Sequence, residues 1–76
     1  MLSRVNWQTP SWMSRYLVFD AAVDGIERSF AVIADLLSVA PDEPAALTLE
    51  RNLFRLRDRI ERAARENTAS HMIYII

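Results

Sequence analysis

The chain has 76 residues, a hydrophobic fraction of 51%, a formal net charge of −1 and no cysteine. This length predicts one domain, residues 1–76, that is short enough to gain stability from self-association. The hydrophobic fraction is enough for a core and argues against a disordered chain. The absence of cysteines excludes disulfides and thiolate metal sites and is typical of a cytoplasmic protein.

The N-terminal segment predicts neither export nor membrane insertion. Polar residues and a proline interrupt residues 1–12, which lack the apolar run of a signal peptide. No stretch approaches the roughly 18 consecutive apolar residues that span a bilayer. We therefore expect a soluble cytoplasmic protein without a membrane partner.

The first predicted element is a short strand. Residues Leu2 to Trp7 alternate loosely between apolar and polar side chains, and Thr9-Pro10-Ser11 is expected to end the strand. Trp12 is expected to cover one end of the core. Trp7 and Trp12 together could form an aromatic ligand patch, although covering a small core is the simpler interpretation.

The stretch from Arg15 to Ile33 predicts a β-hairpin about Asp24-Gly25. A two-residue type I′ turn needs positive φ at both central positions, which glycine adopts freely and aspartate tolerates. Counting outward from the turn pairs Val23/Ile26, Ala21/Arg28, Phe19/Phe30 and Leu17/Val32 on one face, and Ala22/Glu27, Asp20/Ser29, Val18/Ala31 and Tyr16/Ile33 on the other. The second face is polar near the turn and apolar toward the open end, so we expect it to be only partly covered.

An amphipathic helix competes for the same residues, because apolar side chains recur at alternating spacings of three and four. They are Tyr16, Phe19, Val23, Ile26, Phe30, Ile33 and Leu37. In such a helix Gly25 would cost about 1 kcal/mol relative to alanine, whereas β-branched and aromatic flanks favour strands. We therefore favour the hairpin and keep an all-α helical hairpin as the alternative.

Residues 34–39 predict one or two helical turns, with Leu36 and Leu37 packed underneath the sheet. Residues 40–44 form the predicted linker to a long helix. In this linker Asp42 is a candidate N-cap, and Pro44 suits the first helical turn.

The long helix is predicted from Pro44 to Glu66, on the basis of one apolar stripe. The stripe consists of Leu49, Leu53, Leu56, Ile60, Ala63 and Ala64. Leu47 and Phe54 lie to one side of it and are expected to widen the buried arc. Residues 67–70 then predict a stop and a turn.

Residues 71–76 are short, β-branched and almost wholly apolar, and they predict a final strand. Such a strand needs a partner, either the hairpin or the same strand of a second subunit. The predicted fold class is therefore α+β: a small antiparallel sheet, made of the hairpin and the C-terminal strand, packed against one long helix.

Several short motifs follow one another in an order similar to that of a known family. They are the Val18–Phe19 segment leading to Val23-Asp24-Gly25, Leu36-Leu37, Asp42-Glu43, the Phe54-x-x-Arg57-x-x-Ile60 helix with Ala64, and the apolar tail strand. From about Val5 to Ile76 the chain resembles the small proteobacterial family catalogued as domain of unknown function 1488. The resemblance implies an α+β fold and no known activity.

The sequence predicts no catalytic, cofactor-binding or metal site. There is one histidine, His71, with no nucleophile motif around any serine, and a single glycine cannot build a phosphate-binding loop. Asp20, Asp24 and Asp35 could in principle pair as acid and base. The turn already explains Asp24, however, and Asp20 points to the opposite side of its strand from Phe19. We therefore expect a protein that is not an enzyme and has no cofactor.

Four arginines of the long helix fall on a broad face opposite the apolar stripe: Arg51, Arg55, Arg59 and Arg62. This face could bind the phosphates of a nucleic acid. Asp58 and Glu66 share the face, and a net charge of −1 supplies no bulk attraction, so a solvated mixed-charge surface is the simpler interpretation.

Arg57 lies beside the apolar stripe, within reach of Glu50 or Glu61. The structural interpretation is a packed stem with a paired guanidinium, and the functional one is a contact with an acidic ligand or partner. Our leading hypothesis is a non-catalytic interaction or regulatory module that forms a homodimer through the apolar edge around Tyr74. The alternative is a nucleic-acid-binding accessory protein that uses the arginine face.

Overall fold

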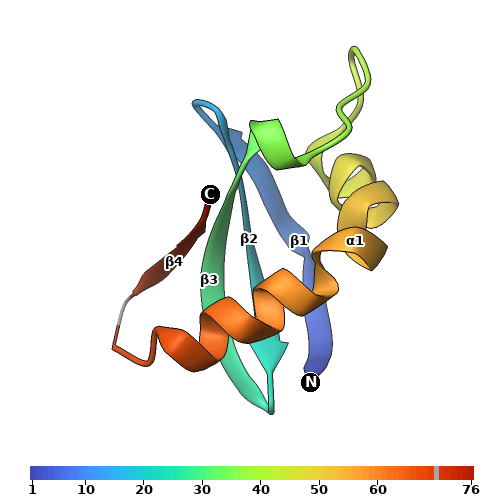
Figure 1. Cartoon of the computed structure of the whole chain (residues 1–76). Coiled ribbons are helices and arrows are strands. Elements are labelled where there is room, and N and C mark those ends of the chain that lie inside the picture. The colour runs from blue at the N-terminus through green and yellow to red at the C-terminus, as the bar shows by residue number, and fades with distance from the viewer. Residues whose placement is uncertain (70) are drawn as a thin grey trace.

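The computed structural model describes residues 1–69 and 71–76, arranged as one sheet and one long helix. In chain order the elements are β1 (Leu2–Met13), β2 (Tyr16–Val23), β3 (Ile26–Ile33), the 3-10 helix η1 (Ala34–Leu36), α1 (Ala45–Glu66) and β4 (Met72–Ile75). The strands lie in the order β1-β2-β3-β4, and α1 crosses one face of the sheet (Figure 1). The α+β prediction is confirmed, and the all-α alternative is wrong. Ser70, the last residue of the predicted turn, lies outside the described residues.

The hairpin about Asp24-Gly25 has the predicted register. Asp24 has a φ of 53° and Gly25 a φ of 82°, the positive values that a type I′ turn requires. All eight predicted pairs of β2 and β3 are present. The rings of Phe19 and Phe30 stack with their centroids 5.6 Å apart, so the turn aligns the two largest side chains of the core.

Strand β1 is longer than predicted, because Thr9-Pro10-Ser11 does not end it. The pairing with β2 shifts register between Asn6 and Ser11 and then continues to Met13. Inside this irregularity the Thr9 hydroxyl accepts the backbone N–H of Asp20 at 2.9 Å, in place of a ladder bond. Pro10 is tolerated because β1 is an edge strand, where a missing N–H costs least.

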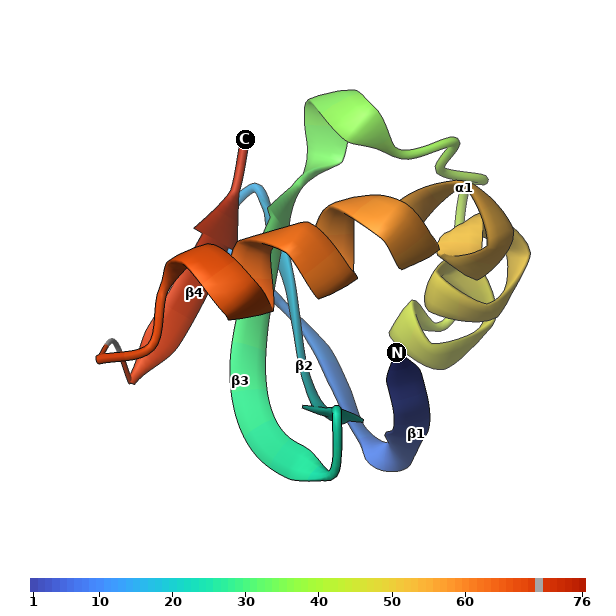
Figure 2. The ribbon, with the colours of Figure 1, turned by 60° about the horizontal axis from the view of Figure 1, so that its bottom comes forward.

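The sheet is mixed and not wholly antiparallel as predicted, because β4 runs parallel to β3. Helix α1 has 22 residues and is therefore about 33 Å long, at 1.5 Å per residue. That length returns the chain along the sheet, so β4 begins at the end of the sheet where β3 began (Figures 1 and 2). A helical crossover of this kind joins parallel strands.

The core fills the space between α1 and the facing side of the sheet. Its largest fully buried apolar side chains are Phe19, Phe30, Leu17, Leu49, Ile60, Ile73 and Val32. The predicted helix stripe is confirmed, and Leu36 and Leu37 pack against the core as expected. In the part of the chain that the structure describes, no helix is both long and apolar enough to traverse a lipid bilayer.

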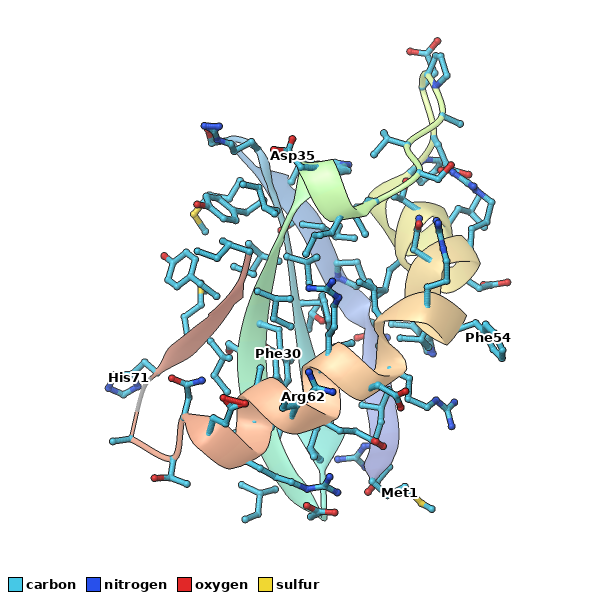
Figure 3. The ribbon with its side chains drawn as sticks, viewed as in Figure 1. Met1, Phe30, Asp35, Phe54, Arg62 and His71 are labelled. Carbon is cyan, nitrogen blue, oxygen red and sulfur yellow. The ribbon has the colours of Figure 1, made fainter. Side chains whose placement is uncertain are left out.

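Two predictions about α1 are wrong. Phe54 is 92% exposed and Leu47 is 49% exposed, so neither widens the buried arc. At about 100° per residue Phe54 lies about 140° around the helix from Leu49, and its ring points away from the sheet (Figure 3). Pro44 occupies the N-cap position predicted for Asp42, which instead has a φ of 59° in the preceding turn.

Candidate interaction surfaces

Arg51, the first arginine of the predicted phosphate-binding face, is bonded within the molecule. Its Nε donates to Glu43 Oε2 at 2.7 Å and its Nη2 to Glu43 Oε1 at 2.7 Å, while Nη2 also donates to the carbonyl of Ser38 at 2.8 Å. These bonds from Arg51, followed by that from the Thr48 hydroxyl, lower the pKa of Glu43 to about 2. Arg51 therefore fastens the linker to α1.

Asn52, beside Arg51, completes this attachment and is 1% exposed. Its Nδ2 donates to the carbonyls of Ser38 at 3.0 Å and Thr48 at 2.7 Å. Its Oδ1 accepts the backbone N–H of Ser38 at 2.9 Å and Arg55 Nη2 at 2.7 Å. The amide is fully bonded, and Arg55 is held by it. The burial of Asn52 could have been predicted from the sequence, because Asn52 lies between Leu49 and Leu56 along the apolar stripe.

Arg59 and Arg62 differ from Arg51 and Arg55. Within residues 1–69 and 71–76, neither has a hydrogen bond or an ion pair. Together they line a shallow hollow of about 230 Å³ beside β4, which Glu66 and Tyr74 also line. The four predicted arginines therefore divide into a bonded pair near the linker and a free pair near β4.

Arg57 lies on the other flank of α1. It lines a separate hollow of about 370 Å³ with Trp7 and Leu53, next to β1. Neither predicted carboxylate pairs with it. Glu61 instead accepts the backbone N–H of Leu2 and lies 3.9 Å from the terminal ammonium of Met1. The predicted ion pair of Arg57 is absent from the described part of the chain.

The sheet face that α1 does not cover, which we call the open face, is divided into an apolar and a polar half. Residues paired across the strands form rows of side chains on the open face. Two such rows lie in the apolar half, and a third lies at the border with the polar half. The first row is Met13, Tyr16 and Ile33, the second is Ser11, Val18, Ala31 and Tyr74, and the third, at the border, is Asn6, Asp20, Ser29 and Met72. Met13 is 54% and Tyr74 is 57% exposed. Large apolar side chains of this face are therefore in contact with solvent.

The polar half of the open face contains residues that could suggest chemistry. Asp20, Ser29 and His71 all line a hollow of about 330 Å³ there. The Ser29 hydroxyl, however, donates to Asp20 Oδ1 at 2.6 Å and has no hydrogen bond to His71 among the described residues. Nucleophilic catalysis needs such a base beside the hydroxyl. In the same part of the chain, no three His, Cys, Asp or Glu side chains are grouped to hold a metal ion.

Asp24 has a contact beyond its role in the turn. Its carboxylate accepts Arg65 Nε at 3.2 Å and also the terminal ammonium of Met1. The hydrogen bond from the terminal ammonium and then that from Arg65 lower the pKa of Asp24 below its ordinary value. The tip of the hairpin is thereby attached to the last turn of α1.

The aromatic residues form two ring contacts within the described residues, Phe19 with Phe30 and Tyr16 with Tyr74. Trp7 and Trp12, both partly exposed, are not among them, so the hypothetical tryptophan ligand patch has no ring-to-ring contact. Tyr16 and Tyr74 instead place an aromatic pair on the apolar half of the open face.

Comparisons of the chain with family models, with curated proteins and with solved structures find no match. The resemblance to the family of unknown function 1488 stays a prediction.

Proposed function

We propose that this protein is a non-catalytic protein-interaction or regulatory module that acts as a homodimer through the apolar half of its open face. The observation that supports this proposal most is the cluster of Met13, Tyr16, Val18 and Tyr74, in which Met13 and Tyr74 are each more than half exposed. A sheet with an apolar face gains stability when a second layer covers it, and α1 covers the other face.

A second copy is the occupant that fits this surface. The four side chains carry no charge at neutral pH, so two copies meet there without electrostatic repulsion. A two-fold axis through the apolar half would pack it against itself, as self-complementary dimer interfaces require. The polar half, with the Arg4–Glu27 ion pair at 3.3 Å, would then lie at the hydrated rim that such interfaces have.

The lack of cysteine supports a cytoplasmic location for this dimer, because disulfide-free small domains are typical of reducing compartments. Membership of the proteobacterial family of unknown function 1488 is part of the proposal, and the order of the short sequence motifs supports it.

The alternative function, a nucleic-acid-binding accessory protein, has less support. Of the four arginines that would contact phosphates, Arg51 and Arg55 donate to groups of the same chain. The remaining pair, Arg59 and Arg62, shares its hollow with Glu66. A salt titration with mixed DNA and RNA tests this alternative, since phosphate contacts weaken steeply as salt rises. Saturable binding that Arg59→Glu abolishes would support it.

Sedimentation equilibrium at micromolar concentration tests the dimer. We expect the wild-type protein to sediment as a dimer and Met13→Glu to sediment as a monomer, because the substitution places a charge in the interface. Phe54→Glu is the matched control, since it introduces the same charge at an exposed apolar residue on the far side of α1. A wild-type monomer, or a dimer lost on Phe54→Glu and kept on Met13→Glu, would contradict the proposal.

A further inference from the structure

The register of the hairpin determines which backbone groups point toward β4. In a two-residue hairpin the residues that flank the turn, Val23 and Ile26, form a hydrogen-bonded pair. Backbone groups of successive residues in a strand point to alternate sides. Phe30, four residues after Ile26, therefore directs its N–H and C=O toward β2, and Ala31 directs its own toward β4.

The same alternation leaves backbone groups unpaired along the outer edge of β4. Ala31 lies opposite Tyr74 in the parallel ladder, so its N–H and C=O bond to the residues on either side, Ile73 and Ile75. Met72 and Tyr74 then direct their N–H and C=O groups away from the sheet. β4 is the last strand in the sheet order, and an edge of this kind is a template for one more strand.

The helix side of this edge carries two guanidinium groups. Arg59 and Arg62 line the hollow there together with Glu66 and the last residue, Ile76. Neither arginine is engaged elsewhere in the described chain. An extended segment paired with β4 would direct every second side chain toward these guanidinium groups, and carboxylates are the groups that guanidinium binds best in a bidentate manner.

The opposite side of the edge is apolar. Tyr74 projects onto the open face, and the residue is 57% exposed. Side chains of an added strand that point to that face would lie beside the Tyr74 ring, and apolar groups suit that position. The two sides of the edge therefore require acidic and apolar residues in alternation.

We propose that the outer edge of β4 binds an extended acidic segment of a partner protein as a fifth strand, with its carboxylates facing Arg59 and Arg62. The inference rests on the proposed interaction function and names the chemistry of the partner. It uses the backbone edge of β4 and the arginines on its helix side, whereas the dimer uses the apolar half of the open face, and Tyr74 borders both surfaces. An acidic segment fits better than a second β4, because antiparallel pairing of two copies would bring Arg59 and Arg62 of both onto the same side of the sheet.

A pair of labelled eight-residue peptides tests this inference by fluorescence anisotropy. One alternates valine with glutamate, and the other alternates valine with lysine. We expect saturable binding of the glutamate peptide with a Kd below about 1 mM, the range of weak single-strand contacts, and at least about tenfold weaker binding of the lysine peptide. Equal binding of both peptides, or no saturation by the glutamate peptide, would overturn the proposal.

Charge-matched variants locate the site. The double variant Arg59→Glu/Arg62→Glu should weaken glutamate-peptide binding by at least about tenfold. The double variant Arg4→Glu/Arg57→Glu makes the same charge change beside β1, at the opposite edge of the sheet. It should leave the affinity within about twofold, because charges beyond the Debye length are largely screened at 0.15 M salt. An equal loss in both variants would show a non-specific charge effect and overturn the assignment.

Met72→Pro tests the backbone contact. Proline is tolerated at the first residue of an edge strand whose N–H points outward, so circular dichroism should show an intact fold while peptide affinity falls. In amide NMR spectra of the wild type, the N–H signals of Met72 and Tyr74 should shift most on titration with the peptide. If these signals stay unchanged, or if a single-stranded RNA displaces the peptide with equal affinity, the edge does not bind an acidic strand.

The oligomeric state is measured in the same samples. The Arg59→Glu/Arg62→Glu variant should sediment as the wild type does, because neither arginine lies on the open face. Failure of the dimer would appear as a wild-type monomer that still binds the peptide. Failure of the edge site would appear as a dimer that does not bind it.

Discussion

Tyr16 of β2 and Tyr74 of β4 meet edge to face across the strand that separates them, with ring centroids 5.3 Å apart and planes at 82°. Between them lies Ala31 of β3, which is only 1% exposed although it is on the open face. Ala22 has a similar position in the polar half, where Arg4 and Glu27 flank it and form an ion pair. The tyrosines meet diagonally, because Tyr16 lies one row away from Ala31 and Tyr74. In both places a small residue of the intervening strand lets two long side chains from non-adjacent strands meet above the sheet.

The tyrosine contact predicts a measurable coupling. Edge-to-face pairs contribute about 0.5–1.5 kcal/mol beyond the area that they bury. A double-mutant cycle with Tyr16→Leu and Tyr74→Leu, followed by urea unfolding, should give a coupling free energy of about 1 kcal/mol. The wild type, the two single variants and the double variant should be measured at a protein concentration where all four have the same state of association. Additive effects would show that the rings do not interact in solution.

The hydrogen bonds of Asn52 predict a loss of stability when leucine, a side chain of similar size, replaces it. Asn52→Leu should lower the free energy of unfolding by about 1–3 kcal/mol, because it leaves the backbone N–H of Ser38 and the Nη2 of Arg55 without the acceptor that they share. Asn67→Leu is the control, because the Asn67 amide is exposed and bonds a single carbonyl at the helix end. Urea unfolding of the two variants compares them, and equal losses would contradict the role assigned to Asn52.

The lowered pKa of Glu43 predicts that the free energy of unfolding decreases in acid. Its pKa falls from 4.5 to about 2 in the folded chain because Arg51 and then Thr48 donate hydrogen bonds to the carboxylate. A lowered folded-state pKa stabilises the fold above the unfolded value, and that stabilisation disappears as the pH falls through the folded value. The free energy of unfolding should therefore decrease between about pH 4.5 and pH 2.

Glu43→Gln removes this titration, so its unfolding free energy should fall less than that of the wild type over the same interval. Glu50→Gln, an exposed helix position, controls for the loss of a carboxylate as such. Parallel acid dependences of Glu43→Gln and the wild type, measured by urea unfolding at a series of pH values, would refute the contribution of the Arg51–Glu43 pair.

The register of the hairpin could be predicted because it depends on local chemistry alone. Once Asp24 and Gly25 adopt positive φ, the pairing of every residue from Tyr16 to Ile33 follows by counting. The direction of β4 depends on where a 22-residue helix returns the chain, which is a matter of three-dimensional path. The sequence nevertheless contained the strand–helix–strand order that favours parallel pairing.

The arginine surface shows the limit of helical periodicity. Periodicity placed Arg51, Arg55, Arg59 and Arg62 on one side of α1, but it could not show that the linker folds back so that Glu43 and Ser38 accept bonds from Arg51. The prediction that Phe54 is buried was wrong for a related reason. A large apolar residue near the stripe is buried only where another element covers that side of the helix. In the described part of the chain no element does, and Phe54 is exposed.

The most direct measurement is sedimentation equilibrium of the wild-type protein, Met13→Glu and Phe54→Glu at micromolar concentration. If the apolar half of the open face joins two copies, the wild type and Phe54→Glu will have twice the 8.8 kDa chain mass, and Met13→Glu will have the mass of a single chain. A wild-type protein that sediments at the mass of one chain would contradict the proposed homodimer.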